Sequence, residues 1–143
     1  MFKIDPVLRN DCHDMGSLGL CRLLLTDNKA YPWFILVPQR EGLCELHQLT
    51  GEDRTRLWQE SERLSVWLQQ VYAADKLNIA ALGNVVGQLH VHHIARYRTD
   101  PAWPKPIWGI GVPEPYSEAE ISALRHRLSA AFPDLDTSAC VDL

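Results

Sequence analysis

One long helical pattern in the middle of the chain constrains the fold more than any other feature. Apolar residues recur at helical spacing across residues 52–74, and Thr50 with Asp53 forms the capping-box pattern that starts a helix. The apolar residues of this stripe are Leu57, Leu64, Trp67, Leu68 and Val71. A helix of this length with one apolar stripe must bury that stripe against another layer of structure.

Four shorter apolar runs, two on each side of the helix, are candidates for that second layer. They span residues 19–26, 31–38, 77–82 and 88–97 and are rich in strand formers. The turn-like sequence DNKA separates the first two runs and predicts a hairpin that ends at Pro38, while GNVVG joins the last two. These patterns predict an α+β fold in which an antiparallel sheet carries the long helix across one face.

The N-terminal residues and a proline-rich arm are expected to cover the remaining surface. Asp5 as an N-cap and Pro6 at the first helical position predict a short opening helix. Residues 100–116 are rich in proline and read as an extended arm. The arm is not a flexible linker, because Trp103 and Trp108 need surfaces to pack on.

A second helix is predicted near the C-terminus. Ser117 and Glu120 form another capping box, an apolar face follows, and Pro133 ends the pattern. The chain shows no internal repeat and no low-complexity tract. We therefore expect one domain spanning residues 1–143.

Composition indicates a globular protein and argues against several classes of partner. The chain has 143 residues, 46% of them hydrophobic, and a formal net charge of −4. An acidic chain repels nucleic acids and acidic membranes, so any phosphate site must be built locally. We find no secretory signal pattern and no apolar run long enough for a membrane helix. The scattered cysteines lack zinc-type spacing and are expected to be reduced thiols of a cytoplasmic protein: Cys12, Cys21, Cys44 and Cys140.

Three histidines crowd into the last strand candidate, in the sequence GQLHVHHIAR. Because side chains alternate along a strand, Gln88, His90 and His92 are expected to share one face and His93 the other. His90 and His92 lie two residues apart, roughly 6.6 Å along a strand. One phosphate group or one metal ion fits between two imidazoles at that spacing.

Three interpretations of this histidine pair stay open from the residues alone. A metal site normally needs a third ligand, and no Asp or Glu lies between Asp75 and Asp100, although His47 could supply one from a distance. The pair could also be hydrogen-bonded core histidines. Nucleophilic catalysis explains the pair best, because one neutral imidazole can attack phosphorus while the other assists the group that leaves.

The sequence QLHVHHI, residues 88–94, resembles the signature of the histidine triad (HIT) family of nucleotide hydrolases and transferases, His-φ-His-φ-His-φ-φ with φ apolar. Gln88 replaces the first histidine, and His93 replaces an apolar residue. The resemblance extends to Gly83-Asn84, to Asn78 and to the hairpin LLLTDNKAYPWFILVPQR, and it covers about residues 18–109. It implies an α+β HIT-like fold with an antiparallel sheet of about five strands, one long helix across it and a C-terminal helix, as in a bacterial branch of HIT hydrolases.

The resemblance also implies roles for the triad residues. His90 is expected to be the nucleophile and to form a covalent nucleotidyl-imidazole intermediate. His92 is expected to contact the transferred phosphate and to help the leaving group. The main-chain carbonyl of Gln88 is expected to hold the proton on the far nitrogen of His90, a function that any residue at that position retains.

For substrate binding, the resemblance implies polar residues beside an apolar slot for the base. Asn84 is expected at the phosphate, and Asp27, with Asn28 as neighbour, at the ribose hydroxyls; Asn78 completes the substrate-binding set. Asp27 is equally well explained as a turn residue. Val85 replaces a Ser or Thr that family members often use toward the leaving group.

The remaining expectations concern partners and side chains outside the triad. The resemblance implies no cofactor, a nucleotide substrate and a homodimer. Trp33 is expected to pack. Arg96, Arg98 and Lys105 could supply local positive potential near the site, but solvated surface charge is the better expectation for each. Two alternatives to an enzyme remain: a nucleotide-binding protein without turnover, and a metal-binding protein that uses His90 and His92. The choice between hydrolase and transferase, the base and the leaving group stay open.

Overall fold

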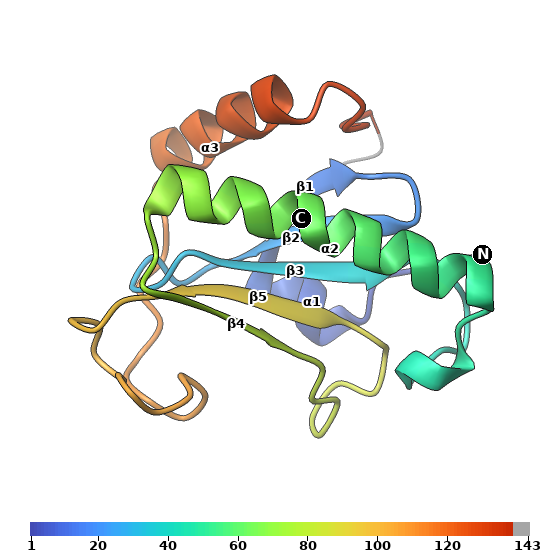
Figure 1. Ribbon diagram of the computed structural model, residues 1–143, viewed down its shortest axis with the longest axis horizontal. Coiled ribbons are helices and arrows are strands. Elements are labelled where there is room, and N and C mark those ends of the chain that lie inside the picture. Colours follow the sequence, from blue (N-terminus) through green and yellow to red (C-terminus); the bar gives the residue numbers. More distant parts are fainter. Residues whose placement is uncertain (139–143) are drawn as a thin grey trace.

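A five-stranded antiparallel sheet forms the centre of the computed structural model, which describes residues 1–138 (Figure 1). The strands lie in the order β1-β2-β3-β5-β4. The strands are β1 (Cys12–Ser17), β2 (Cys21–Thr26), β3 (Trp33–Pro38), β4 (Lys76–Ala80) and β5 (Val91–Arg96). The helices are α1 (Pro6–Asp11), α2 (Gly51–Tyr72), α3 (Glu118–Ala131) and a short 3₁₀ helix (Leu46–Gln48). This architecture confirms the predicted α+β fold of about five strands, with one long helix and a C-terminal helix.

The predicted hairpin and the predicted second strand pair are both present. β2 pairs with β3, and β4 pairs with β5, each in antiparallel register. The two pairs meet where β3 lies beside β5, with Ile35 opposite His92. This non-local pairing brings the first hairpin against the histidines.

β1 was not expected, and it supplies the fifth strand. Its sequence, CHDMGS, mixes polar and apolar residues and lacks the run of strand formers found in the other strands. The register to β2 shifts between Asp14 and Gly16, and Gly16 has a φ of 128°. Pairing with β2, and not the intrinsic preference of these residues, therefore makes the segment a strand.

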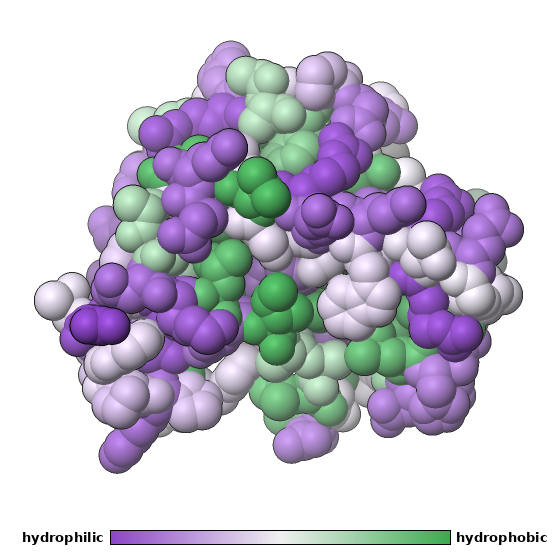
Figure 2. All heavy atoms as spheres, in the orientation of Figure 1, coloured by the Kyte–Doolittle hydropathy of each residue, from purple (hydrophilic) through white to green (hydrophobic). Residues whose placement is uncertain are grey.

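α2 and α3 cover one face of the sheet (Figure 1). Thr50 caps α2 by accepting a hydrogen bond from the Asp53 amide at 3.1 Å, as the capping-box pattern predicted. The apolar stripe of α2 packs on inward-facing residues of the central strands in the largest core cluster. On the side that Figure 2 shows, hydrophobic atoms are interspersed with hydrophilic ones. Within residues 1–138, no helix combines the length and hydropathy needed to cross a bilayer.

The opposite face of the sheet carries α1, the N-terminal residues and the proline-rich arm. Asp5 caps α1, with its side chain accepting from the Val7 amide at 2.8 Å, so the predicted opening helix is confirmed. Leu8 of α1 packs with Leu24 and Ile35 in a second cluster on this face. Arm residues pack with Tyr31 and Ile94 in a third.

Candidate active site

A pocket of about 420 Å³ opens on the face of the sheet that α1 covers. His92 lines it from β5, His90 from the position just before that strand, and Trp33 from β3. The other walls are α1, the loop at residues 82–86 and Trp108 of the arm. Thr26 of β2 lines the pocket as well, so six separate segments of the chain meet around two buried histidines.

The main chain selects one tautomer of His90. Its Nδ1 lies 2.6 Å from the carbonyl oxygen of Gln88. A carbonyl can only accept a hydrogen bond, so Nδ1 carries the proton and Nε2 keeps its lone pair. His90 is only 6% exposed, which limits rotation of the ring. In its neutral form the ring therefore has its lone pair on Nε2.

His92 is held in the opposite form by Trp33. The indole Nε1–H can only donate, and it donates to Nδ1 of His92 at 2.9 Å. The proton of the neutral ring therefore lies on Nε2. Burial, together with the neighbouring His90 and His93, lowers the pKa of His92 to about 3. His92 is thus a neutral hydrogen-bond donor at physiological pH.

Trp33 had been expected only to pack, so the sequence interpretation missed this contact. The signal that could have revealed it is the pairing of β3 with β5, which sets Trp33 opposite Ile94 and diagonal to His92. That pairing was not among the predicted ones.

Aromatic rings surround the two imidazoles. The centroids of His90 and His92 lie 4.9 Å apart with an interplanar angle of 67°. Trp108 meets His92 edge-on at 5.1 Å and Trp33 at 6.3 Å. Trp108 therefore packs on the site and helps to exclude water from His92. This agrees with the prediction that the tryptophans of the arm need surfaces to pack on.

His93 points to the other face of the sheet. One of its ring nitrogens lies 2.7 Å from the Ser61 hydroxyl of α2 and the other 3.1 Å from the Val91 carbonyl. Burial lowers its pKa to about 4. His93 is a satisfied core histidine, so only two of the three clustered histidines belong to the pocket.

The pocket offers few charges and no reactive thiolate. Asp11 is the only charged residue among those lining it. Cys12 also lines it, but burial raises the pKa of its thiol to about 12, so the thiol stays protonated. Across residues 1–138, no group of three or more potential metal ligands gathers, and His90 with His92 therefore lacks the third protein ligand that a metal site normally has.

Comparison with known proteins identifies the family. The protein-family model described as the HIT domain matches residues 8–99, well over half of the chain. The chain belongs to the HIT family. This confirms the resemblance that the sequence QLHVHHI indicated.

Solved structures of other HIT proteins superpose on almost the whole chain. A histidine triad protein from Marinobacter aquaeolei VT8 shares 42% identity, covering 94% of this chain and 98% of its own, with a TM-score of 0.90. One from Sinorhizobium meliloti 1021 shares 42% identity, covering 92% and 97%, with a TM-score of 0.88. One from Bradyrhizobium japonicum shares 38% identity, covering 92% and 98%, also with a TM-score of 0.88. Among curated proteins the chain has no match.

Asp27 and Asn28, expected at the ribose, bind the arm in this HIT protein. Asp27 accepts a hydrogen bond from the Tyr116 amide at 2.9 Å, and Asn28 accepts one from the Glu114 amide at 3.2 Å. Both line a cavity that adjoins the histidine pocket, and Trp33 lines both cavities. The structure therefore brings these two residues near the histidines but not into the same pocket.

Asn78 and Arg96 form a buried polar network at the far end of β5. Arg96 is 1% exposed, so the expectation of a solvated surface charge is wrong for it. Its guanidinium donates to Asn78 at 2.7 Å and forms an ion pair with Asp100 at 2.8 Å. Burial raises the pKa of Asp100, but hydrogen bonds from Arg96 and two main-chain amides outweigh this and leave it at about 2. The arginine is buried because a carboxylate and an amide satisfy its donors. Asn78 does not line the histidine pocket.

Asn84 and Val85 lie at the mouth of the histidine pocket. Both line it, and Val85 is 90% exposed. Asn84 therefore lines the same pocket as the two histidines, and its contact with phosphate stays a prediction. The side chain of Gln88 does not line the pocket; it hydrogen-bonds to the main chain of Lys3 and Asp5.

Proposed function

We propose that this HIT protein is a nucleotide hydrolase or nucleotidyl transferase that acts in two steps through a nucleotidyl-His90 intermediate. HIT proteins generally bind nucleotides and act as hydrolases or transferases. The observation that carries the proposal is the 2.6 Å contact between His90 Nδ1 and the Gln88 carbonyl. This contact leaves the lone pair of Nε2 free to attack phosphorus.

In the first step, Nε2 of His90 attacks the nucleotide phosphorus. A phosphorus–nitrogen bond forms, and the bond to the leaving group breaks with its electron pair staying on that group. The ring becomes cationic, and the Gln88 carbonyl stabilises it through the proton on Nδ1. The Nε2–H of His92 donates to a phosphoryl oxygen or to the leaving atom, where negative charge develops.

In the second step, the acceptor attacks the same phosphorus and His90 leaves as the neutral imidazole. Water as acceptor loses a proton and gives a nucleoside monophosphate; a phosphorylated acceptor makes the reaction a transfer. Asn84 contacts the phosphate, and Asp27 and Asn28 contribute from the adjoining cavity. Asn78, expected in the substrate-binding set, instead holds Arg96 at the far end of β5 and takes no part. The protein groups supply the charge compensation, and no cofactor takes part. The protein is proposed to be a cytoplasmic homodimer that binds neither nucleic acid nor membranes.

The test is a screen of dinucleoside polyphosphates, nucleoside phosphoramidates and nucleotide sugars, combined with mass analysis of the protein during turnover. We expect an increment of one nucleoside monophosphate on the peptide that carries His90, preserved at high pH because the phosphorus–nitrogen bond is acid-labile. His90→Ala should abolish both turnover and adduct while leaving nucleotide affinity within about tenfold. His47→Ala, on the exposed 3₁₀ helix, is the matched control and should retain both. Nucleotide binding with no turnover and no adduct in the wild type would leave a binding protein instead.

A further inference from the structure

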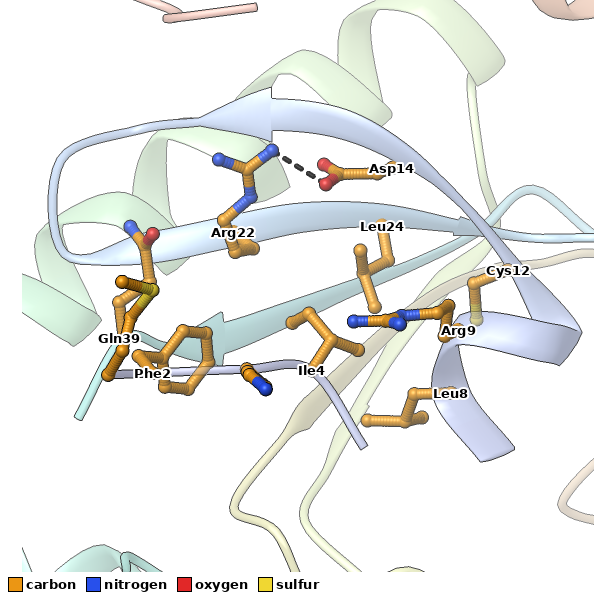
Figure 3. A pocket seen from close by; sticks show the side chains of 11 residues that line it. Phe2, Ile4, Leu8, Arg9, Cys12, Asp14, Arg22, Leu24 and Gln39 are labelled. Carbon is orange, nitrogen blue, oxygen red and sulfur yellow. Dashed lines mark hydrogen bonds and ion pairs between the residues drawn. The ribbon is translucent and has the colours of Figure 1, made fainter. Parts of the chain in front are cut away.

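The N-terminal segment, residues 1–5, lies across the sheet on the side of the histidine pocket. Phe2 and Ile4 pack against the cluster that contains Leu8 and Leu24. Figure 3 shows these side chains around a cavity between the segment, α1 and the strands beneath. The segment is extended and belongs to no helix or strand, so specific contacts must hold it in position.

The side chain of Gln88 makes two hydrogen bonds to this segment. Its Oε1 accepts from the Asp5 amide at 2.9 Å, and its Nε2 donates to the Lys3 carbonyl at 2.8 Å. The main-chain carbonyl of the same residue accepts from His90 Nδ1. One residue therefore holds both the nucleophile's ring and the N-terminal segment.

Asp5 links the segment to the pocket wall. Its side chain caps α1 through the Val7 amide. Val7, Leu8 and Asp11 of α1 line the histidine pocket. A shift of Asp5 would thus move the first turn of α1, which forms one side of the pocket.

The amide group of glutamine suits this double contact, and imidazole does not. A primary amide presents an acceptor and a donor side by side, like a main-chain peptide, and so matches a carbonyl and an amide two residues apart. The two nitrogens of an imidazole diverge from one another across the ring. A histidine at position 88 can reach one of the two main-chain groups but not both.

We propose that Gln88 is a positioning residue: it holds the N-terminal segment so that α1 closes one side of the histidine pocket, and this closure determines how well the substrate binds. The inference rests on the proposed function of the pocket. Gln88 then has two separate roles. Its side chain supports substrate binding, and its main-chain carbonyl supports the chemistry at His90.

Hydrogen exchange tests the contact without reference to activity. Gln88→Ala and Gln88→His should each speed exchange in residues 2–8 by about tenfold or more. Alanine removes both hydrogen bonds from residue 88 to the segment, and histidine keeps at most one of them. Gln69→Ala is the matched control, because Gln69 also donates to a main-chain carbonyl at 2.8 Å but at the end of α2. It should leave residues 2–8 unchanged. Unchanged exchange in both Gln88 variants would overturn the proposal.

A double-mutant cycle tests whether Gln88 acts through Asp5. Asp5→Pro removes the amide hydrogen that Gln88 accepts, and the φ of −53° at this position suits proline. Asp5→Ala removes the cap but keeps the amide. In the wild-type background, Gln88→Ala should raise KM about tenfold with kcat within about threefold and with the His90 adduct retained. The same change should raise KM clearly less with Asp5→Pro, where only the Lys3 contact is left to lose, and should have its full effect with Asp5→Ala.

The outcomes separate this inference from the proposed function. Equal effects of Gln88→Ala on KM in both Asp5 backgrounds would overturn it, as would a loss confined to kcat. If the wild type shows no turnover, the proposed function fails, and the cycle is measured instead by the affinity for adenosine and guanosine monophosphates. Affinity that does not change while exchange of residues 2–8 increases would show a structural contact only and would overturn the role in binding.

Discussion

At the scale of single residues, the two pocket histidines differ because their Nδ1 atoms have opposite partners. The Gln88 carbonyl accepts from His90, whereas the Trp33 indole donates to His92. The first contact leaves a lone pair on Nε2, and the second leaves a proton there. The neutral rings thus present a lone pair at one Nε2 and a donor at the other, from the same residue type two positions apart.

Trp33→Phe should weaken catalysis more than binding. Phenylalanine keeps the ring but removes the N–H, so His92 becomes free to take the other tautomer, in which Nε2 cannot donate. We expect kcat to fall about tenfold with nucleotide affinity within about threefold. Nitrogen-15 NMR should detect protonated Nε2 and unprotonated Nδ1 on His92 in the wild type, and a mixture in the variant.

Trp108→Phe is the matched control for this change. It alters an aromatic neighbour of His92 but keeps the Trp33 hydrogen bond, so the tautomer of His92 should not change. A wild-type His92 that carries its proton on Nδ1 would contradict the interpretation.

At the scale of elements, the end of α2 determines how the chain enters β4. Ala73 ends the helix with a φ of 48°, in the left-handed region, and its amide donates to the Gln69 carbonyl at 3.1 Å. Glycine adopts this conformation without the steric cost that Ala73 bears. The predicted helix, residues 52–74, therefore extended past the residue at which the chain reverses.

Ala73→Gly should stabilise the protein by about 0.5–1 kcal/mol, measured by urea unfolding. The control is Ala123→Gly, at an exposed position inside α3, which should destabilise by about 1 kcal/mol because glycine is a poor helix former. The same substitution, alanine to glycine, should thus raise the free energy of unfolding at position 73 and lower it at position 123. Destabilisation by Ala73→Gly would mean that the left-handed conformation is not the native one.

At the scale of the whole molecule, two buried neutral histidines link stability to pH. Burial lowers the pKa of His92 to about 3 and that of His93 to about 4, from 6.5. Between pH 6.5 and 4 the unfolded chain binds protons that the native protein does not. Native stability is therefore complete above pH 6.5 and falls as pH decreases, by up to about 1.4 kcal/mol per pH unit for each histidine.

Urea unfolding at pH 7.5, 6 and 5 measures this dependence. In His93→Asn, the free energy of unfolding should change less between these pH values, because only His92 still contributes from the buried pair. The variant should also be less stable at pH 7.5, where the contacts to Ser61 and Val91 are lost. An identical pH dependence in wild type and variant would contradict the assignment of His93 as a neutral core residue.

Local patterns in the sequence predicted most of the helices and strands and singled out His90 and His92. The apolar stripe predicted α2, the capping residues predicted where α1, α2 and α3 begin, and strand formers predicted four of the strands. The alternation of side chains predicted that His93 lies on the face opposite to His92. These features depend on residues close together in the chain, where periodicity and capping chemistry act directly.

Only the tertiary structure decided which distant groups meet the histidines. The pairing of β3 with β5 brings the Trp33 indole to His92, and Gln88 meets the N-terminal segment across more than 80 residues of chain. β1 becomes a strand only beside β2, and Arg96 is buried only because Asp100 and Asn78 satisfy its donors. The physical reason is that a hydrogen bond or ion pair between distant residues depends on the packed fold, which no local pattern encodes.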